Sequence, residues 1–370
     1  MEYTYKFRIY LTPSQIEQIN QTFGSVRFVY NYYLAKCKEA WEKNHKTINY
    51  YDCAKDLTTL KKELEWLKIP DSTALQSSLK NLDVAFQNFF HGLKTNQKMG
   101  YPKFKSRKNH LKTYESKCVG KTIEILNNRI KLPKLGLVKC RISKQVHGRI
   151  LSATVSQNPS GKYFVALCCT DIELDQLPKT DKQVGIDLGI KDLAITSDGN
   201  KYPNHKYLKQ SEKKLAKLQR QLSRKTSGSK CREKARIKVA RAYEHVANQR
   251  RDMMQKLTTD LIRKYDIICI EDLNVSGMVK NHKLAKAVSD ASFYEFSREL
   301  EYKAKWYGKK VITIDRFFPS SQTCSNCGAQ WKALKDLSQR LWICPSCLIR
   351  HDRDINASIN ILKKGLKSIS

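Results

Sequence analysis

The sequence lacks any apolar run of the roughly 18 residues that a membrane-spanning helix needs. Its opening stretch, MEYTYKFRIYLTP, also lacks the apolar core of a signal peptide. No internal repeat is visible along the chain. We therefore expect a protein without a membrane partner that works in the cytoplasm, in the cytosol or nucleoid of a prokaryote.

Acidic residues are scarce, because 35 Asp and Glu stand against 69 Lys and Arg, which leaves a net charge of +34. An enzyme for small molecules does not need so strong a positive electrostatic field, whereas a protein that binds a polyanion does. We expect binding to phosphate backbones with a strong dependence on salt. The length of 370 residues, 41% of them hydrophobic, predicts two or three domains with sizeable cores.

The cysteines predict a metal site and not a set of disulfides. Four of the twelve cysteines form the pairs CSNC (324–327) and CPSC (344–347), with the C-x2-C-x16-C-x2-C spacing of a zinc ribbon. Four thiolates fill a tetrahedral shell, so we expect structural Zn²⁺ bound by Cys324, Cys327, Cys344 and Cys347. The other eight are interpreted as reduced core residues.

The first half of the chain predicts a helical unit followed by strands. Residues 3–11 alternate as a strand does, and TPSQ then begins a helix with Thr12 as N-cap, Pro13 at the first position and Gln15 in a capping box. Further helices are predicted over about 50–67 and from Asp71 or Ser72. Between about 115 and 175, alternation and turn signals at 127–128 and 159–161 predict a small antiparallel barrel, which the first strand can join.

The second half mixes strands and basic helices. Residues 183–204 predict two strands with turns, and 206–265 predict a helical hairpin divided at TSGSK (226–230). Two apolar segments, DIICIEDL (266–273) and KKVITIDRF (309–317), are predicted to be buried strands.

A connector over residues 94–114, KTNQKMGYPKFKSRKNHLKTY, interleaves cations with aromatic residues. Rings stack on bases while cations meet phosphates, so the pattern favours a groove for a nucleic-acid strand. The alternative is a solvated loop. The candidate contact residues in this connector are Tyr101, Lys103, Phe104, Lys105 and Arg107.

Three acids occupy positions where a carboxylate is costly. Asp187 interrupts the apolar strand VGIDLGI, Glu271 ends the strand IICIE, and Asp354 follows the zinc ribbon in HDRDINASINIL. Each alone has an ordinary explanation, such as a salt bridge, a strand end or a helix N-cap. If the three converge, their repulsion and desolvation are resolved by divalent cations. We therefore predict that they bind Mg²⁺, as two ions, and catalyse phosphodiester cleavage.

One neighbouring acid, Asp352, competes with Asp354 for the third role. Asp272, next to Glu271, is expected to point to the opposite face of its strand and is therefore not a candidate.

The order of these motifs resembles the TnpB (OrfB) family of insertion-sequence proteins, which is related to the type V CRISPR effectors. The resemblance rests on GIDLG, IEDL, CSNCG with WICPSC, and HDRDINASINIL, in that order. The segments KFRIYLTPSQIEQINQTFGSVRFVYNYYL, LQSSLKNLDVAFQNFF and GYPKFKSR extend it over essentially the whole chain. One departure is Leu348, where the family pattern leads us to expect glycine after the last cysteine.

The resemblance implies an α/β multidomain fold. Its parts are an RNase H-like (RuvC) nuclease core, an inserted zinc ribbon, a small antiparallel β-barrel (wedge) and an N-terminal helical recognition domain. The implied boundaries are 1–11 for the first strand of the wedge barrel, 12–112 for the recognition domain, 113–180 for the wedge, 181–316 for the nuclease core, 317–348 for the zinc ribbon and 349–370 for the last part of the core.

The same resemblance implies an RNA-guided endonuclease that cleaves double-stranded DNA beside a short adjacent motif, with a guide RNA from the transposon end. The family's catalytic acids carry over to Asp187, Glu271 and Asp354. Its motif-reading surface is implied to lie in the helical domain and at the junction with the barrel. The candidates there are Tyr51, Gln76 and Lys80, which form a polar helical surface beside aromatic residues; the alternative is ordinary helix surface. We expect a monomer or weak dimer. The alternatives are a guided DNA-binding repressor without cleavage, a transposase that transfers strands, and a structural RNA binder.

Overall fold

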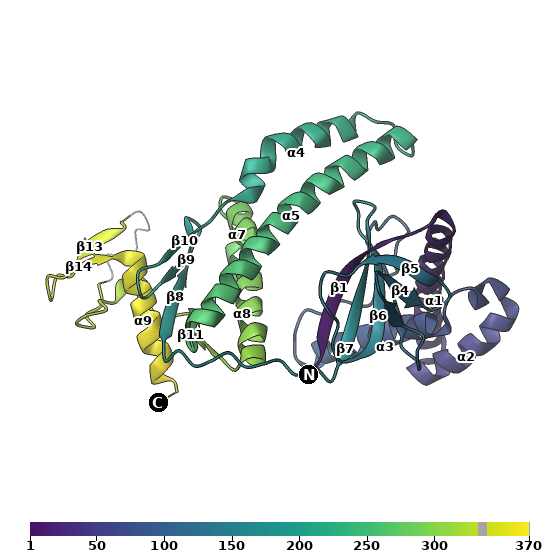
Figure 1. Ribbon diagram of the computed structural model, residues 1–370, viewed down its shortest axis with the longest axis horizontal. Coiled ribbons are helices and arrows are strands. Elements are labelled where there is room, and N and C mark those ends of the chain that lie inside the picture. The colour runs from purple at the N-terminus through teal and green to yellow at the C-terminus, as the bar shows by residue number, and fades with distance from the viewer. Residues whose placement is uncertain (332–338, 370) are drawn as a thin grey trace. The chain divides into compact units, whose positions relative to one another are not determined.

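A computed structural model describes residues 1–331 and 339–369. The chain is a mixed α/β protein that divides into two compact units, Met1–Glu173 and Leu174–Ser370, each with its own sheet (Figure 1).

The first unit contains an antiparallel sheet with the strand order β2-β6-β7-β1-β5-β4-β3. The expectation that the first strand joins this sheet is confirmed, because β1 pairs with β7 on one side and with β5 on the other. The predicted turns also lie between strands, with positive φ angles at Asn127 (52°) and Gly161 (83°). The strands are β1 (Tyr3–Tyr10), β2 (Lys112–Lys117), β3 (Glu124–Leu126), β4 (Arg129–Leu132), β5 (Gly136–Arg141), β6 (Arg149–Gln157) and β7 (Tyr163–Thr170).

Three helices complete the first unit: α1 (Pro13–Asn44), α2 (Tyr50–Glu63) and α3 (Ser72–Lys94). The predicted capping box of α1 is present, since the Thr12 hydroxyl accepts from the Gln15 N–H and the Gln15 side chain accepts from the Thr12 N–H. The second helix is shorter than predicted, because a separate 3₁₀ turn, η1 (Glu65–Lys68), follows it.

The second unit is built around a five-stranded sheet with the order β10-β9-β8-β11-β12. Strands β8, β11 and β12 run parallel, whereas β9 and β10 are antiparallel to their neighbours. The carboxyl ends of β8 and β11 therefore meet at the same edge of the sheet. The strands are β8 (Gln183–Leu188), β9 (Asp192–Thr196), β10 (Lys201–Pro203), β11 (Ile267–Glu271) and β12 (Lys310–Ile314).

Helices cover both faces of this sheet. Figure 1 shows α9 (Arg353–Lys367) on one side of β8 and β11, with α5 (Lys230–Lys264) and α8 (Phe293–Tyr307) on the other. Apolar residues of β8 and β11 pack against α5 and α8 in a buried core. Cys269 and Ile312 pack instead against Ile361 of α9. The sheet is thus the middle layer of three.

The helical hairpin predicted at TSGSK is present, with α4 (Tyr207–Ser223) ending before the break and α5 beginning at Lys230. Three helices were not anticipated from the sequence: α6 (Val275–Met278), α7 (Ala285–Ala291) and α8. In the zinc-ribbon segment, a short 3₁₀ turn η2 (Ser320–Gln322) precedes a two-stranded hairpin of β13 (Leu341–Ile343) and β14 (Arg350–Asp352).

The cysteines outside the zinc motif are free thiols, but they are not all in cores. Cys231 contradicts that prediction, because it lies exposed in the first turn of α5. Among residues 1–331 and 339–369, no helix combines the length and the apolar character that crossing a bilayer requires.

Candidate active site and metal centre

Asp187 faces helix α9 because of the alternation along β8. Val184 and Ile186 belong to the core under α5 and α8, so Gly185 and Asp187 point to the opposite face. A Cβ atom at Gly185 would lie 2.0 Å from the carbonyl oxygen of Ser358, so only glycine allows α9 to pack this closely on the strand. The close packing places the first turn of α9 over the carboxyl end of β8.

Glu271 lies beside Asp187 on the same face. In the parallel register Ile270 pairs with Ile186, so Glu271 follows next to Asp187. The Ser320 hydroxyl of η2 donates a hydrogen bond to the Glu271 carboxylate. Burial raises the pKa of Glu271, and the hydrogen bond from Ser320 opposes that shift.

Helix α9 supplies the third acid, and the structure separates the two candidates for it. Asp352 is the N-cap of α9, where its side chain accepts hydrogen bonds from the backbone N–H groups of Asp354 and Ile355 and forms an ion pair with Lys201 at 2.7 Å. The alternative that Asp354 is the N-cap is therefore wrong. Both carboxylate oxygens of Asp354 instead accept from the Arg340 guanidinium at 2.9 Å.

The charges of Glu271 and Asp354 both act on Asp187, so the three acids lie in one neighbourhood. The pKa of Asp187 is raised well above its ordinary value, first by burial and then by the carboxylates of Glu271 and Asp354. The nearby guanidinium groups of Arg340 and Arg353 act in the opposite direction. In the described part of the chain only the cysteines form a group of three or more ligands whose atoms all lie within 4.8 Å, so the three carboxylates are spaced more widely than that.

The donor type of these three acids is the one that hard divalent cations prefer. Mg²⁺ takes carboxylate oxygens, and an ion held here would keep waters to complete its shell. A positive charge among the acids would offset both their mutual repulsion and the cost of burying an ionised carboxylate, the two effects that raise the pKa of Asp187.

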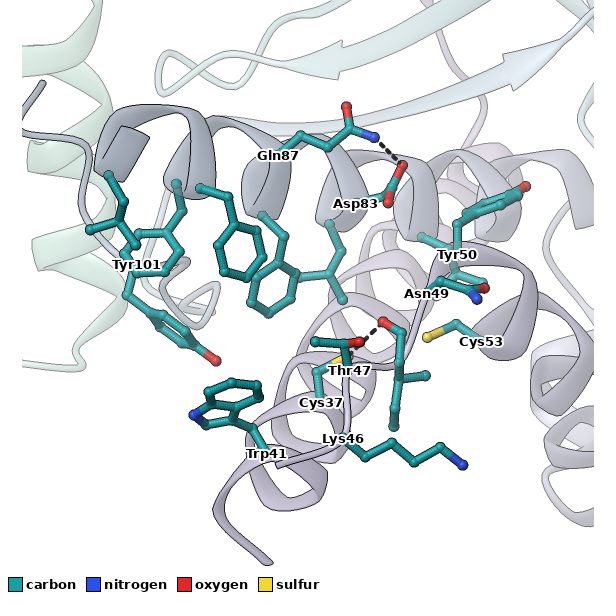
Figure 2. Close-up of a pocket in the computed structure, with 17 residues that line it drawn as sticks. Cys37, Trp41, Lys46, Thr47, Asn49, Tyr50, Cys53, Asp83, Gln87 and Tyr101 are labelled. Carbon is teal, nitrogen blue, oxygen red and sulfur yellow. Dashed lines mark hydrogen bonds between the residues drawn. The ribbon is translucent and has the colours of Figure 1, made fainter. Parts of the chain in front are cut away.

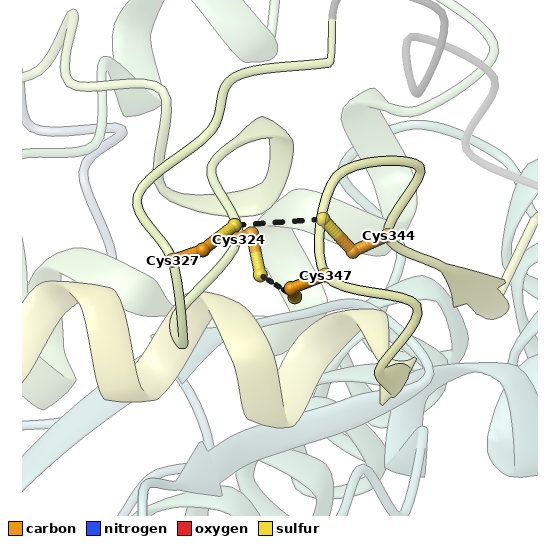
Figure 3. A group of neighbouring side chains, drawn as sticks. All are labelled: Cys324, Cys327, Cys344 and Cys347. Atoms are coloured by element: carbon orange, nitrogen blue, oxygen red, sulfur yellow. Dashed lines mark hydrogen bonds between the residues drawn. The ribbon is translucent and has the colours of Figure 1, made fainter.

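The four predicted zinc ligands come together from two loops. Figure 3 shows their sulfur atoms converging, and all four lie within 4.8 Å of one another. The Cys324 and Cys347 sulfurs are 3.6 Å apart, and those of Cys327 and Cys344 are 3.7 Å apart. Bonds of about 2.3 Å to a tetrahedral zinc ion would separate sulfurs by roughly 3.8 Å. The cysteines therefore fit Zn²⁺ with no position left for a substrate.

The two cysteine loops have the same turn despite the departure at Leu348. The N–H of Gly328 donates to the Cys324 carbonyl, and the N–H of Leu348 donates to the Cys344 carbonyl, each at 2.9 Å. Both residues adopt positive φ angles, 79° at Gly328 and 58° at Leu348. The second loop thus keeps its geometry with a residue for which this conformation is strained.

Replacing Leu348 with glycine should stabilise the second loop. A residue with a side chain loses about 1–2 kcal/mol of stability in the left-handed conformation. Glycine avoids this strain, but ordering its more flexible backbone on folding costs about 0.5–1 kcal/mol. We expect Leu348→Gly to raise stability by about 0.5–1 kcal/mol, measured by thermal melting and by zinc retention against a chelator. The converse variant is Gly328→Ala, whose added Cβ would meet nothing within 4 Å, so only backbone strain should weaken the first loop. Faster zinc loss from Leu348→Gly would contradict this explanation.

Two buried asparagines connect the first cysteine loop to α9. The Asn356 side chain accepts from the Ser325 N–H at 2.8 Å and donates to the Thr323 carbonyl at 2.7 Å. Asn360, one turn later, donates to the Ser320 carbonyl at 2.8 Å. Ser320 also donates to Glu271, so the zinc loop, α9 and Glu271 are held in one network. Sequence reasoning missed this role, although two polar residues four apart in a buried helix were a usable signal.

The residues predicted to read a DNA motif lie on exposed surface of the first unit. Tyr51 is 79% exposed on α2, and Gln76 and Lys80 are exposed four residues apart on α3. The Lys80 ammonium lies 5.1 Å from the ring centroid of Tyr50, whose ring is 5.4 Å from that of Tyr51. The structure therefore brings Tyr51 and Lys80 to one neighbourhood through Tyr50.

Two of the candidate residues in the connector contact the helices, whereas the other three are exposed. Lys105 is an anchor, because its backbone forms two hydrogen bonds with the Asn31 side chain and its ammonium lies 3.9 Å from the Tyr30 ring centroid. The candidates Lys103, Phe104 and Arg107 are exposed, and Tyr101 packs against rings of α3.

Comparison with known proteins identifies the family of this chain. Three family models match: OrfB_IS605 ("Probable transposase") over residues 165–282, a Cas12f1-like TNB domain over 293–361, and the helix-turn-helix domain of OrfB_IS605 over 1–46. A Streptomyces pristinaespiralis protein, provisionally named an RNA-guided DNA endonuclease, is 39% identical over 98% of this chain and 89% of its own length. The chain belongs to the TnpB (OrfB) family.

A second TnpB-family relative is InsQ of Escherichia coli K12, also provisionally named an RNA-guided DNA endonuclease, with 34% identity over 98% of this chain and 92% of its own. The fold resembles that of Cas12f1 in a cryo-EM complex with sgRNA and target DNA, with a TM-score of 0.60, 15% identity and 98% coverage of both chains. Asp187 and Glu271 lie within the transposase match, and Asp354 and the four cysteines lie within the TNB match.

Proposed function

We propose that this TnpB-family protein is an RNA-guided endonuclease that cleaves double-stranded DNA beside a short adjacent motif. The observation that carries the proposal is the strand register that sets Glu271 beside Asp187 at the edge of the parallel strands, with Asp354 near enough to raise the pKa of Asp187. The names of its full-length relatives and the net charge of +34 support the same function. We place its action in the prokaryotic cytosol or nucleoid.

In this interpretation the domains follow the family pattern. The nuclease core of RuvC type comprises residues 181–316 and 349–370, supported by the parallel β8, β11 and β12 with antiparallel β9 and β10. The zinc ribbon is inserted at 317–348. The wedge barrel, residues 1–11 and 113–180, corresponds to the sheet of the first unit, whose strands lie between Tyr3 and Thr170, and 12–112 is the recognition domain.

Two Mg²⁺ ions would be held by Asp187, Glu271 and Asp354, and neighbouring side chains position two of these acids. When bound, Mg²⁺ activates a water nucleophile and stabilises the leaving 3′ oxygen in phosphodiester hydrolysis. Ser320 orients the Glu271 carboxylate by its hydrogen bond, and Asp352 fixes the first turn of α9 that carries Asp354. The zinc centre is structural and keeps the Ser320 segment in place through Asn356 and Asn360.

The partners are a guide RNA from the transposon end and a double-stranded DNA target, bound by a monomer or weak dimer. In such proteins base pairing reads the target, while the protein reads only a short flanking duplex. The exposed Tyr51, Gln76 and Lys80 are our candidates for that reading surface. A guided repressor would not need three partly buried carboxylates in one neighbourhood, and a strand-transferring transposase would not need a guide.

The test begins with the RNA that copurifies with the protein. Sequencing should reveal one dominant species with a fixed scaffold and a variable 3′ end. A plasmid carrying a match to that 3′ end should be linearised only with Mg²⁺ present. Cleavage that is independent of the match, or joined products without RNA, would favour the alternatives.

The bond between Arg340 and Asp354 gives a prediction for the pH profile. The Arg340 charge lowers the pKa of Asp187, so its loss should raise that pKa further and leave more of the carboxyl protonated. We expect Arg340→Gln to shift the acid limb of the pH–rate profile to higher pH, measured on the single-turnover cleavage rate. Arg316→Gln is the matched control, because Arg316 pairs with Asp272. An unshifted acid limb in Arg340→Gln would show that Asp187 does not govern this titration.

A further inference from the structure

A large apolar hollow lies among the helices of the first unit. One end adjoins the candidate motif-reading surface, because Tyr50 and Asp83 line the hollow and both contact Lys80. Its volume is about 530 Å³, and it is lined by the end of α1, the loop before α2 and the second half of α3. Figure 2 shows Trp41 and Tyr101 at one end of the hollow and Asn49 and Tyr50 at the other. Six of its 17 lining residues are aromatic, and four more are leucine or isoleucine (Figure 2).

The mouth of this hollow exposes large apolar side chains. Trp41 is 53% exposed, Phe90 47%, Leu93 60% and Tyr101 42%. The Tyr101 ring meets those of Phe86 and Phe89 nearly edge-on, at 5.6 and 5.4 Å between centroids. In a chain this rich in charge, such a patch marks a binding surface.

A basic strap, residues 94–108, passes beside the mouth. It carries five lysines and one arginine, and residues 84–114 include no Asp or Glu. The strap is fixed to α3 because the Gln97 N–H donates to the Gly92 carbonyl at 2.9 Å. A Cβ atom at Gly92 would lie 2.4 Å from the Met99 side chain, so glycine permits this fold-back. Together with the bonds between Asn31 and Lys105, this holds cations and rings side by side.

We propose that the hollow binds an unstacked base of single-stranded nucleic acid, with the strap contacting the flanking phosphates. An aromatic wall stacks on any base, and positive charges beside it complement the backbone. Asn49, Asp83 and Gln87 also line the hollow. Asp83 is engaged by Lys80 and by the Gln87 amide N–H, and the Asn49 oxygen caps α2, so the polar groups proposed for the edge of the base are the Gln87 oxygen and the Asn49 amide N–H. An apolar protein partner would leave the charge of the strap unmatched. The inference goes beyond the proposed function, which gives the hollow no role. The two share the binding of nucleic acid and the contacts of Lys80 with Tyr50 and Asp83.

The test is equilibrium binding of labelled single strands to the full-length protein without divalent metal. RNA and DNA strands of the same sequence are compared, and the one with the higher affinity identifies which nucleic acid the hollow binds. We expect Trp41→Ala and Tyr101→Ala each to weaken binding about tenfold with an unchanged salt slope, because lost stacking is not electrostatic. Lys103→Gln should lower that slope by about one. Trp66→Ala is the matched control, since Trp66 is 41% exposed but packs on Phe28 outside the hollow.

Ring-retaining variants guard against misfolding. Trp41→Phe and Tyr101→Phe should bind within about twofold of the wild type, because the stacking surface remains. Photocrosslinking with 5-iodouridine strands should label Trp41 or Tyr101. Wild-type binding by both alanine variants would overturn the proposal, and so would a self-association that Trp41→Ala abolishes, because a second copy would then be the occupant. Cleavage is not measured, so either proposal can fail without the other.

Discussion

Replacing Asp187 with asparagine should reduce target cleavage by at least about 10³-fold, because several kcal/mol of transition-state stabilisation depend on the cations that it helps to hold. Guide RNA binding should be unchanged, since Asp187 lies at a strand end under α9. The measurement is single-turnover cleavage of a matched plasmid by purified ribonucleoprotein. Asp272→Asn is the control, because Asp272 is adjacent to Glu271 in sequence but pairs with Arg316. Cleavage at the wild-type rate by Asp187→Asn would remove the proposed site.

The same variant should behave in the opposite way when stability is measured without metal. The pKa of Asp187 is raised in the folded protein, so its contribution favours folding at low pH and is lost as pH rises through that pKa. Metal-free Asp187→Asn should therefore melt at a higher temperature than wild type at neutral pH. The difference should vanish as pH falls toward the ordinary value of about 4. Added Mg²⁺ should raise the melting temperature of the wild type but not of the variant.

Replacing Cys344 with serine should release the zinc and cause the largest loss of stability in the second unit. A structural zinc site contributes folding free energy, of order 10 kcal/mol in small zinc fingers. The first cysteine loop holds Ser320 and α9, so Glu271 and Asp354 should lose their positions and cleavage should fall as well. The measurements are zinc content, thermal melting and cleavage.

The matched control for this variant is Cys231→Ser, which alters an exposed cysteine in α5. It should retain one zinc per chain and the wild-type melting temperature. Full cleavage by zinc-free Cys344→Ser would show that the metal centre does not position the acids.

Alternation and strand order allowed part of the site to be predicted. A carboxylate in VGIDLGI and another at the end of IICIE each stand on an apolar strand, where an ionised acid is costly unless a partner compensates its charge. The parallel register of β8 and β11 places the two acids side by side. The cysteine spacing likewise predicted the cluster, because two turns of fixed geometry bring four sulfurs together. The choice of Asp354 depended on family resemblance, and the structure adds that Asp352 is occupied as the N-cap.

Other features depend on tertiary contacts that no local pattern encodes. Helix α8 buries Phe296 and Leu300 against α5, yet its segment gave no expectation from the sequence. The contact between Arg340 and Asp354 joins the zinc ribbon to α9, and no local rule predicts such a pair. The apolar hollow arises from three helices and a strap whose packing is set by Gly92. The predicted aromatic connector pointed to that surface without revealing a cavity.

The most direct test of the three-carboxylate site is a titration of the metal-free protein with Mn²⁺, followed by electron paramagnetic resonance as a probe of the magnesium positions. We expect wild-type protein to bind Mn²⁺, and Asp187→Asn, Glu271→Gln and Asp354→Asn each to weaken that binding strongly, while Asp272→Asn leaves it unchanged. Equal binding by wild type and all three single variants would contradict a shared metal site.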